Sequence, residues 1–333
     1  MLWLLASTSS LNDLPVHYMR QTLTSKLVAS LLSILPGHEV EEITKLPGRH
    51  SNEVYRVVLD SPRSVVVLKL YHGEDAFSRA NAESSALLSL ESEPILTPRL
   101  LSYSESLPSA FGAPYTLQTW IPGYRADVVL QTSTQELRNT VGHLVGQITY
   151  LIHSIKFQQY GSLSSSEPRF ATWLDFLLHD LDERLAFCQR QNVIDLSYAT
   201  RCRSYVMERL KLLEPTGPSL VHGDLVPVNV LLTLNKKGKL TAGIYDFEWA
   251  SSADPYWEFA QIQRTFFQIP GVERSFLTGY FQDNSVPEDF YQRLALYRIV
   301  EGIQFCSWAL LDPKLRGDVK QAIENIGETI TRS

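Results

Sequence analysis

The stretch SLVHGDLVPVNVLL, residues 219–232, decides how the rest of this 333-residue chain is interpreted. An apolar entry leads into an HGD triplet that ends at Asp224, and Asn229 follows five residues later. The apolar run Val230–Leu232 comes directly after it. A tight loop with this spacing can aim one carboxylate at a reacting hydroxyl and turn an amide oxygen toward a metal ion.

A second apolar segment, GIYDFE at 243–248, delivers another carboxylate, Asp246. The Lys/Gly-rich turn at 235–239 separates the two segments, which predicts a β-hairpin. Asp and Asn are common in turns, so the HGD triplet alone is explained equally well by turn chemistry. The combination of Asp224, Asn229 and Asp246 favours phosphoryl transfer, in which the protein positions groups and offsets charge.

Together the two segments resemble the catalytic loop of the aminoglycoside phosphotransferase and choline kinase superfamily, whose pattern is HGDxxxxN followed by ID[FW][ED]. They are also similar to the protein-kinase pair HRDxxxxN and DFG. Gly223 stands where protein kinases have Arg, and Glu248 where they have Gly; both differences favour the small-molecule kinases. The resemblance implies an α+β, protein-kinase-like fold with two lobes. The small N-lobe would hold an antiparallel sheet and a helix, and the larger C-lobe would be mainly helical.

The same resemblance implies roles for three residues. Asp224 would be the catalytic residue that orients the acceptor hydroxyl and takes its proton. Asn229 and Asp246 would hold Mg²⁺. The γ-phosphoryl group of ATP or GTP would pass to a hydroxylated small molecule, such as an antibiotic, a natural product or an amino alcohol.

Composition narrows the protein class. The chain is 44% hydrophobic and 20% charged, as expected of a globular protein. A formal net charge of -6 argues against a nucleic-acid surface and is compatible with a cationic acceptor, although it is also ordinary for a cytoplasmic protein. Three widely spaced cysteines predict reduced thiols and a cytoplasmic location. No stretch is long enough to span a membrane. A monomer and a homodimer both stay open.

The strand that runs into Trp120 and the Pro-Gly pair at 122–123 resembles the hinge between kinase lobes, which implies an N-lobe over 1–121 and a C-lobe over 122–333. The expected N-lobe elements are a helix at Tyr18–Leu35, strands at Val40–Leu46, Glu53–Leu59, Val65–Tyr71, Arg99–Tyr103 and Pro114–Thr119, and a helix at Asp75–Leu90. The expected C-lobe helices are Thr134–Ile155, Phe170–Gln191, Tyr198–Leu213 with Ser197 as N-cap, and four more at about 258–268, 272–282, 287–310 and 313–331.

Lys69 lies inside the apolar run of a predicted strand. An ammonium group is costly to desolvate there unless it meets an anion, although edge strands also carry Lys defensively. The resemblance implies that Lys69 grips the α- and β-phosphates of the nucleotide and pairs with a helix Glu. Glu83 is the preferred partner over Glu74 and Glu91 because it lies in the middle of the predicted helix.

Four further residues are predicted to bind the nucleotide. The turn at 47–52, which ends in Ser51 and Asn52, would cover the phosphates, although an ordinary hairpin turn explains it equally well. Gln118 and Trp120 lie where a strand ends before a Pro-Gly pair, in the position of a kinase hinge. The resemblance implies that backbone groups here bond the adenine.

Other polar residues are given no chemical role. His153 is expected to brace the catalytic loop. His179 with Asp182 or Glu183 has metal-ligand spacing, but these residues are interpreted as part of a solvated helix face. Segment 254–260 resembles GDPxxDLA with Glu258 in place of the second Asp, so no acceptor contact is predicted for Glu258. Several aromatic residues either line an acceptor cleft or pack in the core: Tyr256, Trp257, Phe305 and Trp308.

Two other classes of protein stay open. A protein kinase is disfavoured by Gly223, by Glu248 and by the absence of an APE segment after Asp246. A pseudokinase or nucleotide-dependent binding module is disfavoured because a non-catalytic domain would have no need of the four residues expected to act in catalysis. These are Lys69, Asp224, Asn229 and Asp246. The sequence leaves open the acceptor, the choice between ATP and GTP, and a role in resistance, biosynthesis or primary metabolism.

Overall fold

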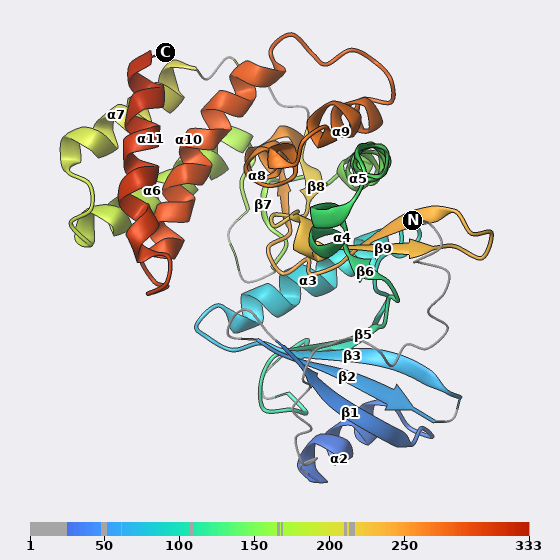
Figure 1. The fold of residues 1–333 in the computed structure, drawn as a ribbon. Coiled ribbons are helices and arrows are strands. Elements are labelled where there is room, and N and C mark those ends of the chain that lie inside the picture. The colour runs from blue at the N-terminus through green and yellow to red at the C-terminus, as the bar shows by residue number, and fades with distance from the viewer. Residues whose placement is uncertain are drawn as a thin grey trace. The chain divides into compact units, whose positions relative to one another are not determined.

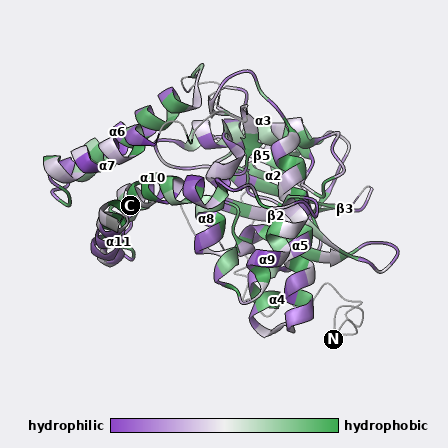
Figure 2. Cartoon of the chain, turned by 90° about the horizontal axis from the view of Figure 1, so that it is seen from above, coloured by the Kyte–Doolittle hydropathy of each residue, from purple (hydrophilic) through white to green (hydrophobic). Residues whose placement is uncertain are grey.

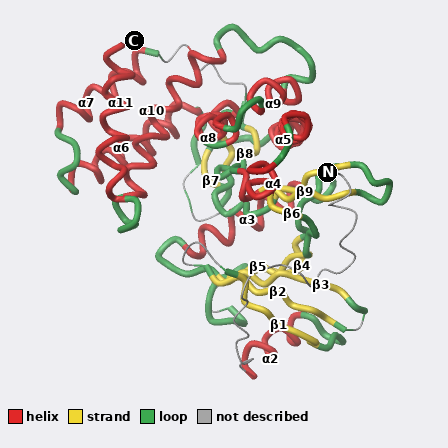
Figure 3. Tube along the Cα trace, in the orientation of Figure 1, coloured by secondary structure: helices red, strands yellow, loops and turns green. Residues whose placement is uncertain are grey.

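The computed structural model describes residues 25–47, 52–60, 62–106, 109–164, 167, 169–209, 212 and 217–332. The chain divides into two compact units (Figure 1). The first, called the sheet unit here, comprises residues 1–131, 163–166 and 228–249; the second, the helical unit, comprises 132–162, 167–227 and 250–333. Figure 3 shows most strands in the former and most long helices in the latter.

The sheet unit is built on a five-stranded antiparallel sheet in the order β1-β2-β3-β5-β4. Its strands are β1 (Val40–Leu46), β2 (Glu53–Leu59), β3 (Ser64–Leu70), β4 (Leu100–Tyr103) and β5 (Tyr115–Thr119). Strand β3 pairs with β2 on one side and β5 on the other, so Lys69 lies on a central strand. The alternative that this Lys protects a sheet edge is therefore wrong.

Helices α2 (Ser25–Ile34) and α3 (Ala76–Leu90) also belong to the sheet unit. Val66, Leu68 and Leu70 of β3 share a buried cluster with Leu31 of α2. Side chains alternate along a strand, so Lys69 projects from the opposite face, where it meets α3. The sheet thus separates an apolar face from the face that carries charge.

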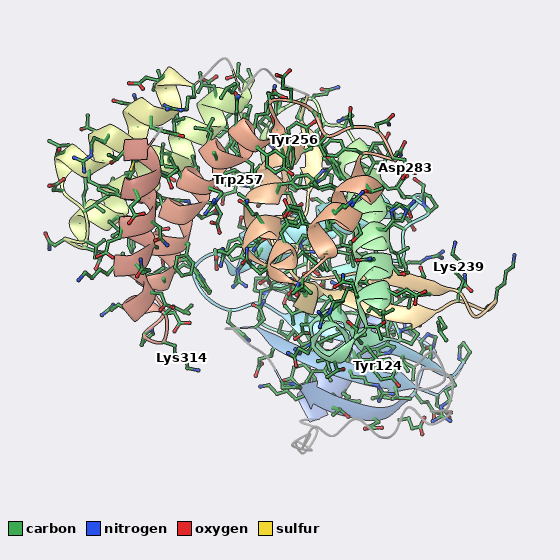
Figure 4. All side chains as sticks on the ribbon, turned by 45° about the horizontal axis from the view of Figure 1, so that its top comes forward. Tyr124, Lys239, Tyr256, Trp257, Asp283 and Lys314 are labelled. Atoms are coloured by element: carbon green, nitrogen blue, oxygen red, sulfur yellow. The ribbon has the colours of Figure 1, made fainter. Side chains whose placement is uncertain are left out.

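The predicted hairpin is present. Strands β9 (Val230–Leu234) and β10 (Leu240–Ile244) pair antiparallel, and β6 (Tyr124–Arg125) adds a third strand beside β9. Figure 4 labels Lys239 at the hairpin turn. Because Val230 pairs with Ile244, Asn229 and Asp246 flank the open end of the hairpin. A short helix α4 (Ala126–Thr132) follows β6, and a 3₁₀ turn η2 (Pro227–Asn229) precedes β9.

The helical unit contains seven α-helices in its described residues. They are α5 (Gln135–Ser154), α6 (Trp173–Arg190), α7 (Leu196–Glu208), α8 (Glu258–Arg264), α9 (Val272–Tyr280), α10 (Phe290–Ala309) and α11 (Val319–Arg332). A small sheet joins β7 (Gly161–Ser162), β11 (Ser251–Ala253) and β8 (Ser219–Val221), and three 3₁₀ turns are η3 (Pro255–Trp257), η4 (Phe266–Gln268) and η5 (Arg316–Asp318). Hydrophobic and hydrophilic residues mix along the helices in Figure 2. No helix in the described ranges is apolar and long enough to cross a bilayer. The predicted α+β fold class is confirmed.

Several predicted helix ends are wrong. The helix predicted from Phe170 begins at Trp173, because the Thr172 side chain accepts a hydrogen bond from the Asp175 N–H. The next helix is capped by Asp195 rather than Ser197. A carboxylate two residues earlier satisfies the Tyr198 N–H, which starts the helix sooner than periodicity indicated. Residues 18–24 of the first predicted helix and residues 210, 211 and 213 of the third C-lobe helix lie outside the described residues.

Helices α5 and α9 pack with their backbones in contact (Figures 1 and 2). A Cβ atom added at Gly146 would lie 2.1 Å from the carbonyl oxygen of Phe276. One added at Gly279 would lie 2.1 Å from the carbonyl oxygen of His143. Both glycines are therefore required by the close approach of the two helices.

Helices α6, α7, α10 and α11 form a group in which α10 packs on α6 and α11, and α7 packs on the same two. Cys188, Cys202 and Cys306, which lie on α6, α7 and α10, are fully buried free thiols. Burial raises the pKa of Cys188 to about 11, and that of Cys202 and Cys306 to about 12. The expected reduced thiols thus lie in the interior of one helical group.

These thiols are expected to be inert in the native protein. Only the thiolate reacts, and a thiol with a pKa of about 11 is ionised to about one part in 10⁴ at pH 7. Titration with a thiol-reactive disulfide should show no fast reaction in native buffer and three equivalents in denaturant. Stoichiometric labelling within minutes in native buffer would contradict the packing described here.

Candidate active site

Lys69 is the centre of the charged face of the sheet unit. Its Nζ lies 2.9 Å from Oε2 of Glu83 and 3.0 Å from Oε2 of Glu248, and it also pairs with Asp246. The Tyr71 hydroxyl donates to the same Glu83 oxygen. Burial alone would lower the pKa of Lys69, but the negative charges of Asp246 and Glu83 outweigh it and hold this pKa well above its ordinary value. Glu83 is thus the helix partner of Lys69, as predicted.

Glu248 has a second set of partners that sequence reasoning missed. Its Oε2 accepts a hydrogen bond of 2.6 Å from Nδ2 of Asn52 and lies 3.3 Å from Nη1 of Arg79. The same Arg79 nitrogen donates to Oδ1 of Asn52 at 2.8 Å. The end of the predicted phosphate-covering turn is therefore tied to the second acid of the GIYDFE segment; Ser51 lies outside the described residues. Arg79 could have been found from its spacing, four residues before Glu83 on one helix.

Asn229 and Asp246, the predicted metal ligands, flank the open end of the hairpin. The Tyr245 N–H donates to the Asn229 carbonyl oxygen at 3.2 Å, and the Tyr245 hydroxyl donates to the Val228 carbonyl oxygen at 2.6 Å. Asp246 adopts φ = 73°, a left-handed conformation that costs free energy for a non-glycine residue and is typical of functional sites. An amide oxygen and a carboxylate are hard donors of the kind that Mg²⁺ prefers, so these residues fit the ion.

One group of acids could itself hold a cation. Carboxylate oxygens of Glu83, Asp246 and Glu248 all lie within 4.8 Å of one another. Lys69 and Arg79 contact this group, so three carboxylates face two cationic side chains. The group carries one negative charge in excess, which favours the approach of a further cation.

Gln118 and Trp120 lie at the end of β5, but their polar groups are already engaged. The Trp120 N–H donates to the Val65 carbonyl oxygen at 3.2 Å, and Nε2 of Gln118 donates to Oγ1 of Thr116 at 2.8 Å. The Trp120 bond continues the pairing of β5 with β3, whereas the Gln118 bond joins two side chains of β5. The predicted contact of Trp120 with adenine would therefore use its carbonyl oxygen.

The loop that carries Asp224 belongs to the helical unit. Gly223 adopts φ = 78°, which is the physical reason for glycine where protein kinases have Arg. The backbone N–H groups of His222 and Gly223 donate to Oε2 and Oε1 of Glu258 at 2.6 and 3.0 Å. The Asp224 N–H lies 3.2 Å from Nδ1 of His222. One carboxylate thus holds the backbone just before the predicted catalytic residue.

Glu258 is in turn held by His153. The His153 Nε2 lies 3.5 Å from Oε2 of Glu258, and its Nδ1 lies 2.9 Å from the hydroxyl of Tyr280. Burial alone would raise the pKa of Glu258, but the adjacent His153 and His222 outweigh it and lower this pKa. His153 thus lies beside the carboxylate that holds the loop, and its bracing role stays a prediction.

Glu258→Gln is expected to lower the free energy of unfolding by about 1 to 3 kcal/mol at pH 7, because one of the two backbone N–H groups would face an amide NH₂. The folded-state pKa of Glu258 is lowered, so its stabilisation is complete above its ordinary pKa of 4.5 and is lost as pH falls through the folded value. Urea unfolding at pH 7, 5, 4 and 3 should therefore show the two proteins converging only below pH 4.5.

Glu324→Gln on α11 is the matched control, because Glu324 is about half exposed and pairs only loosely with Lys320. It should change stability by less than about 0.5 kcal/mol at every pH. An equal loss in both variants would contradict the role of Glu258.

Asp224 has a side-chain partner that the sequence did not reveal. Nε2 of Gln261 donates to Oδ1 of Asp224 at 2.6 Å. Gln261 lies three residues after Glu258 on α8, so the two share a helix face. The three-residue spacing from Glu258 could have indicated that Gln261 lies near the loop. That prediction would first require knowing that Glu258 holds the loop.

The remaining candidates pack or face solvent. Tyr256 and Trp257, labelled in Figure 4, take part in aromatic contacts: Tyr256 with Phe290 at 5.6 Å, and Trp257 with Tyr297 at 5.6 Å between ring centroids. Core packing is thus the better interpretation for these two aromatics. Phe305 lies under the Arg264 guanidinium, and Trp308 is 39% exposed. His179 pairs with Glu183 on an exposed helix face, as expected.

Comparison with known proteins agrees with the geometry. The model of the phosphotransferase enzyme family matches residues 42–297. The fold is similar to a thermostable mutant of the aminoglycoside phosphotransferase APH(4)-Ia, with a TM-score of 0.65, 18% identity, and coverage of 92% of this chain and 98% of that one. It is also similar to APH(2″)-IIa in a streptomycin–ATP complex, with a TM-score of 0.65, 14% identity, and coverage of 92% and 97%.

A third similar structure is a mutant of aminoglycoside 2′-phosphotransferase-IIIa in complex with GDP, with a TM-score of 0.65, 16% identity, and coverage of 92% and 97%. The comparison with curated proteins found no match. At these identities the solved structures establish the fold, while the family model covers more than three quarters of the sequence. The chain thus belongs to the phosphotransferase enzyme family and is a small-molecule kinase with a kinase-like fold.

Proposed function

We propose that this phosphotransferase moves the γ-phosphoryl group of ATP or GTP to a hydroxyl group of a small molecule. The observation that carries the proposal is the buried Lys69 ammonium on a central strand, held between Glu83 and Asp246. A buried ammonium with a strongly raised pKa is a fixed positive charge. Such a charge is suited to bind phosphate oxygens.

Each residue then has a definite task. Lys69 donates to the α- and β-phosphates while Glu83 keeps it oriented. Asn229 and Asp246 hold Mg²⁺, which when bound supplies charge neutralisation at the phosphate oxygens. Asp224 orients the acceptor hydroxyl and takes its proton late, because the transition state of phosphoryl transfer is loose. The chain limits the Asp224–Asn229 separation to about 18 Å, since the two positions are five residues apart.

The wider assignment is also part of the proposal. Residues 1–121 would bind the nucleotide and 122–333 would supply the catalytic loop and the acceptor site. The turn with Ser51 and Asn52 would close over the phosphates, and the Gln118–Trp120 backbone would bond the base. We propose a cytoplasmic enzyme, with no nucleic-acid or membrane partner, that acts as a monomer or a homodimer.

The proposed acceptor class is supported by structures of similar proteins and by the charge of the chain. APH(4)-Ia has been solved with ADP and hygromycin B, APH(2″)-IIa with streptomycin and ATP, and a further relative with kanamycin and GDP. These proteins were thus solved with an aminoglycoside and with either an adenine or a guanine nucleotide, which supports such ligands for this chain. The net charge of -6 is compatible with a cationic acceptor. Resistance, biosynthesis and primary metabolism are all consistent with such an acceptor.

The test is nucleotide consumption with Mg²⁺ and ATP or GTP against aminoglycosides, peptide antibiotics, choline, sugars and amino alcohols. A phosphorylated product that depends on Asp224, established with Asp224→Ala, would support the proposal. Absence of both turnover and nucleotide binding by thermal shift would overturn it. Nucleotide binding without turnover on a widened panel would favour the pseudokinase alternative.

A further inference from the structure

A single short helix, α8, holds the predicted catalytic loop at two points. Glu258 in its first turn accepts hydrogen bonds from the backbone N–H groups of His222 and Gly223. Gln261, one turn later, donates from Nε2 to Oδ1 of Asp224 at 2.6 Å. The helix therefore fixes the backbone of the loop through one side chain and its carboxylate through the other.

The hydrogen bond from Gln261 is of a strong kind. Its acceptor is a carboxylate, and charge-assisted bonds are shorter and stronger than bonds between neutral groups. Only the amide nitrogen can face the Asp224 oxygen favourably, because the amide oxygen would repel it. The orientation of the Gln261 amide is thus set by Asp224.

The carbonyl oxygen of the same Gln261 amide has no comparable hydrogen bond among the described residues. Oε1 of Gln261 is buried and has no hydrogen-bond donor among the residues that the structure describes. A buried acceptor without a partner lowers stability, and an apolar side chain of the same length would not. Retaining an amide at a cost to stability is expected where a residue serves function rather than folding.

We infer that Gln261 is a positioning residue for phosphoryl transfer: it holds the Asp224 carboxylate in the orientation that receives the acceptor hydroxyl. This inference rests on the proposed function. A displacement of about 1 Å in a reacting group costs about 10²-fold in rate, so losing this hydrogen bond should act on turnover more than on binding. Gln261 belongs to the helical unit, and the predicted nucleotide contacts of Lys69, Asn52 and Trp120 do not involve it.

The test compares Gln261→Met with Gln263→Met. Both glutamines lie on α8 and both have a buried Oε1 without a donor among the described residues, but only Gln261 contacts Asp224. Residues two apart on a helix face different directions, so Gln263 is a control for the same chemical change. For Gln261→Met we expect kcat to fall about 10- to 100-fold, with the nucleotide KM within about twofold of wild type and Tm equal or higher. Gln263→Met should leave kcat unchanged.

A purely structural role predicts another pattern. If Gln261→Met folds and leaves kcat at the wild-type value while Asp224→Ala is inactive, the inference is overturned. Gln261→Glu keeps the size but replaces the donor with a second carboxylate, and should lose at least as much kcat; it keeps the test decisive if the Met variant does not fold. A wild-type protein as inactive as Asp224→Ala would overturn the proposed function, and this inference with it.

Discussion

Asp224→Asn is expected to lower kcat by about 10²- to 10⁴-fold, because the amide cannot take the proton of the acceptor hydroxyl. The substitution should leave the fold and the position of the side chain unchanged. The Asn carbonyl oxygen can accept the hydrogen bond that Gln261 now gives to Oδ1, so the side chain keeps its place. Steady-state kinetics would measure the loss of kcat. Thermal melting of the same preparations would test the unchanged structure, with Tm expected to stay within a few degrees of wild type.

The control for this variant is Asp283→Asn. Asp283, labelled in Figure 4, is exposed and adopts φ = 62°, a conformation that Asn tolerates at least as well. It removes the same charge from the helical unit without touching the HGD loop, and kcat should be unchanged. An equal loss of kcat in the two variants would point to net charge rather than to the Asp224 carboxylate.

Lys69→Met is expected to lower the free energy of unfolding by about 3 to 5 kcal/mol, because it leaves Glu83 and Glu248 buried without their shared ammonium. The folded-state pKa of Lys69 is raised well above 10.5, so the stabilisation is fully present below that pH and is lost only as pH rises through the folded value. The difference from wild type should therefore be constant between about pH 6 and 9. Denaturant unfolding would measure it, and nucleotide affinity should fall in parallel.

Two further variants test whether the loss of stability in Lys69→Met comes from uncompensated charge and from the burial of the ion pair. Adding Glu83→Gln to Lys69→Met should recover part of the lost stability, because it removes one uncompensated charge. Lys45→Met removes a half-exposed ion pair with Glu53 on the neighbouring strands, and should cost no more than about 1 kcal/mol. Equal losses for Lys69→Met and Lys45→Met would show that Lys69 is not held as described.

Local patterns were sufficient for much of the sheet unit. Strands β1 and β2 run over the predicted residues, and the hairpin β9–β10 follows from two apolar runs around a Lys/Gly turn. Helix α5 has Thr134 as its N-cap and Ile155 as its C-cap, the two ends expected from periodicity. Lys69 and Glu83 were also predictable, because a strand position and a mid-helix position both restrict direction.

Features that depend on distant residues were not predictable. Strands β6, β7 and β11 have two or three residues and so carry no periodic signal. The contacts of Glu248 with Asn52 and Arg79 join segments up to 196 residues apart. The roles of Glu258 and Gln261 required the loop and α8 to be packed together first. In each case the deciding interaction is a tertiary hydrogen bond, and composition or local propensity does not encode its partner.

The close packing of α5 against α9 has an evolutionary consequence. Helix α5 also carries His153, and α9 ends at Tyr280, so the separation of the two helix axes sets where the His153–Tyr280 pair sits beneath Glu258. A side chain at Gly146 or Gly279 would force the axes apart. Among divergent homologues these two positions should stay glycine, or change only together with a shift of both helices, even where the acceptor differs. Selection that maintains the HGD loop would thus also conserve Gly146 and Gly279, although neither glycine is predicted to contact the substrate.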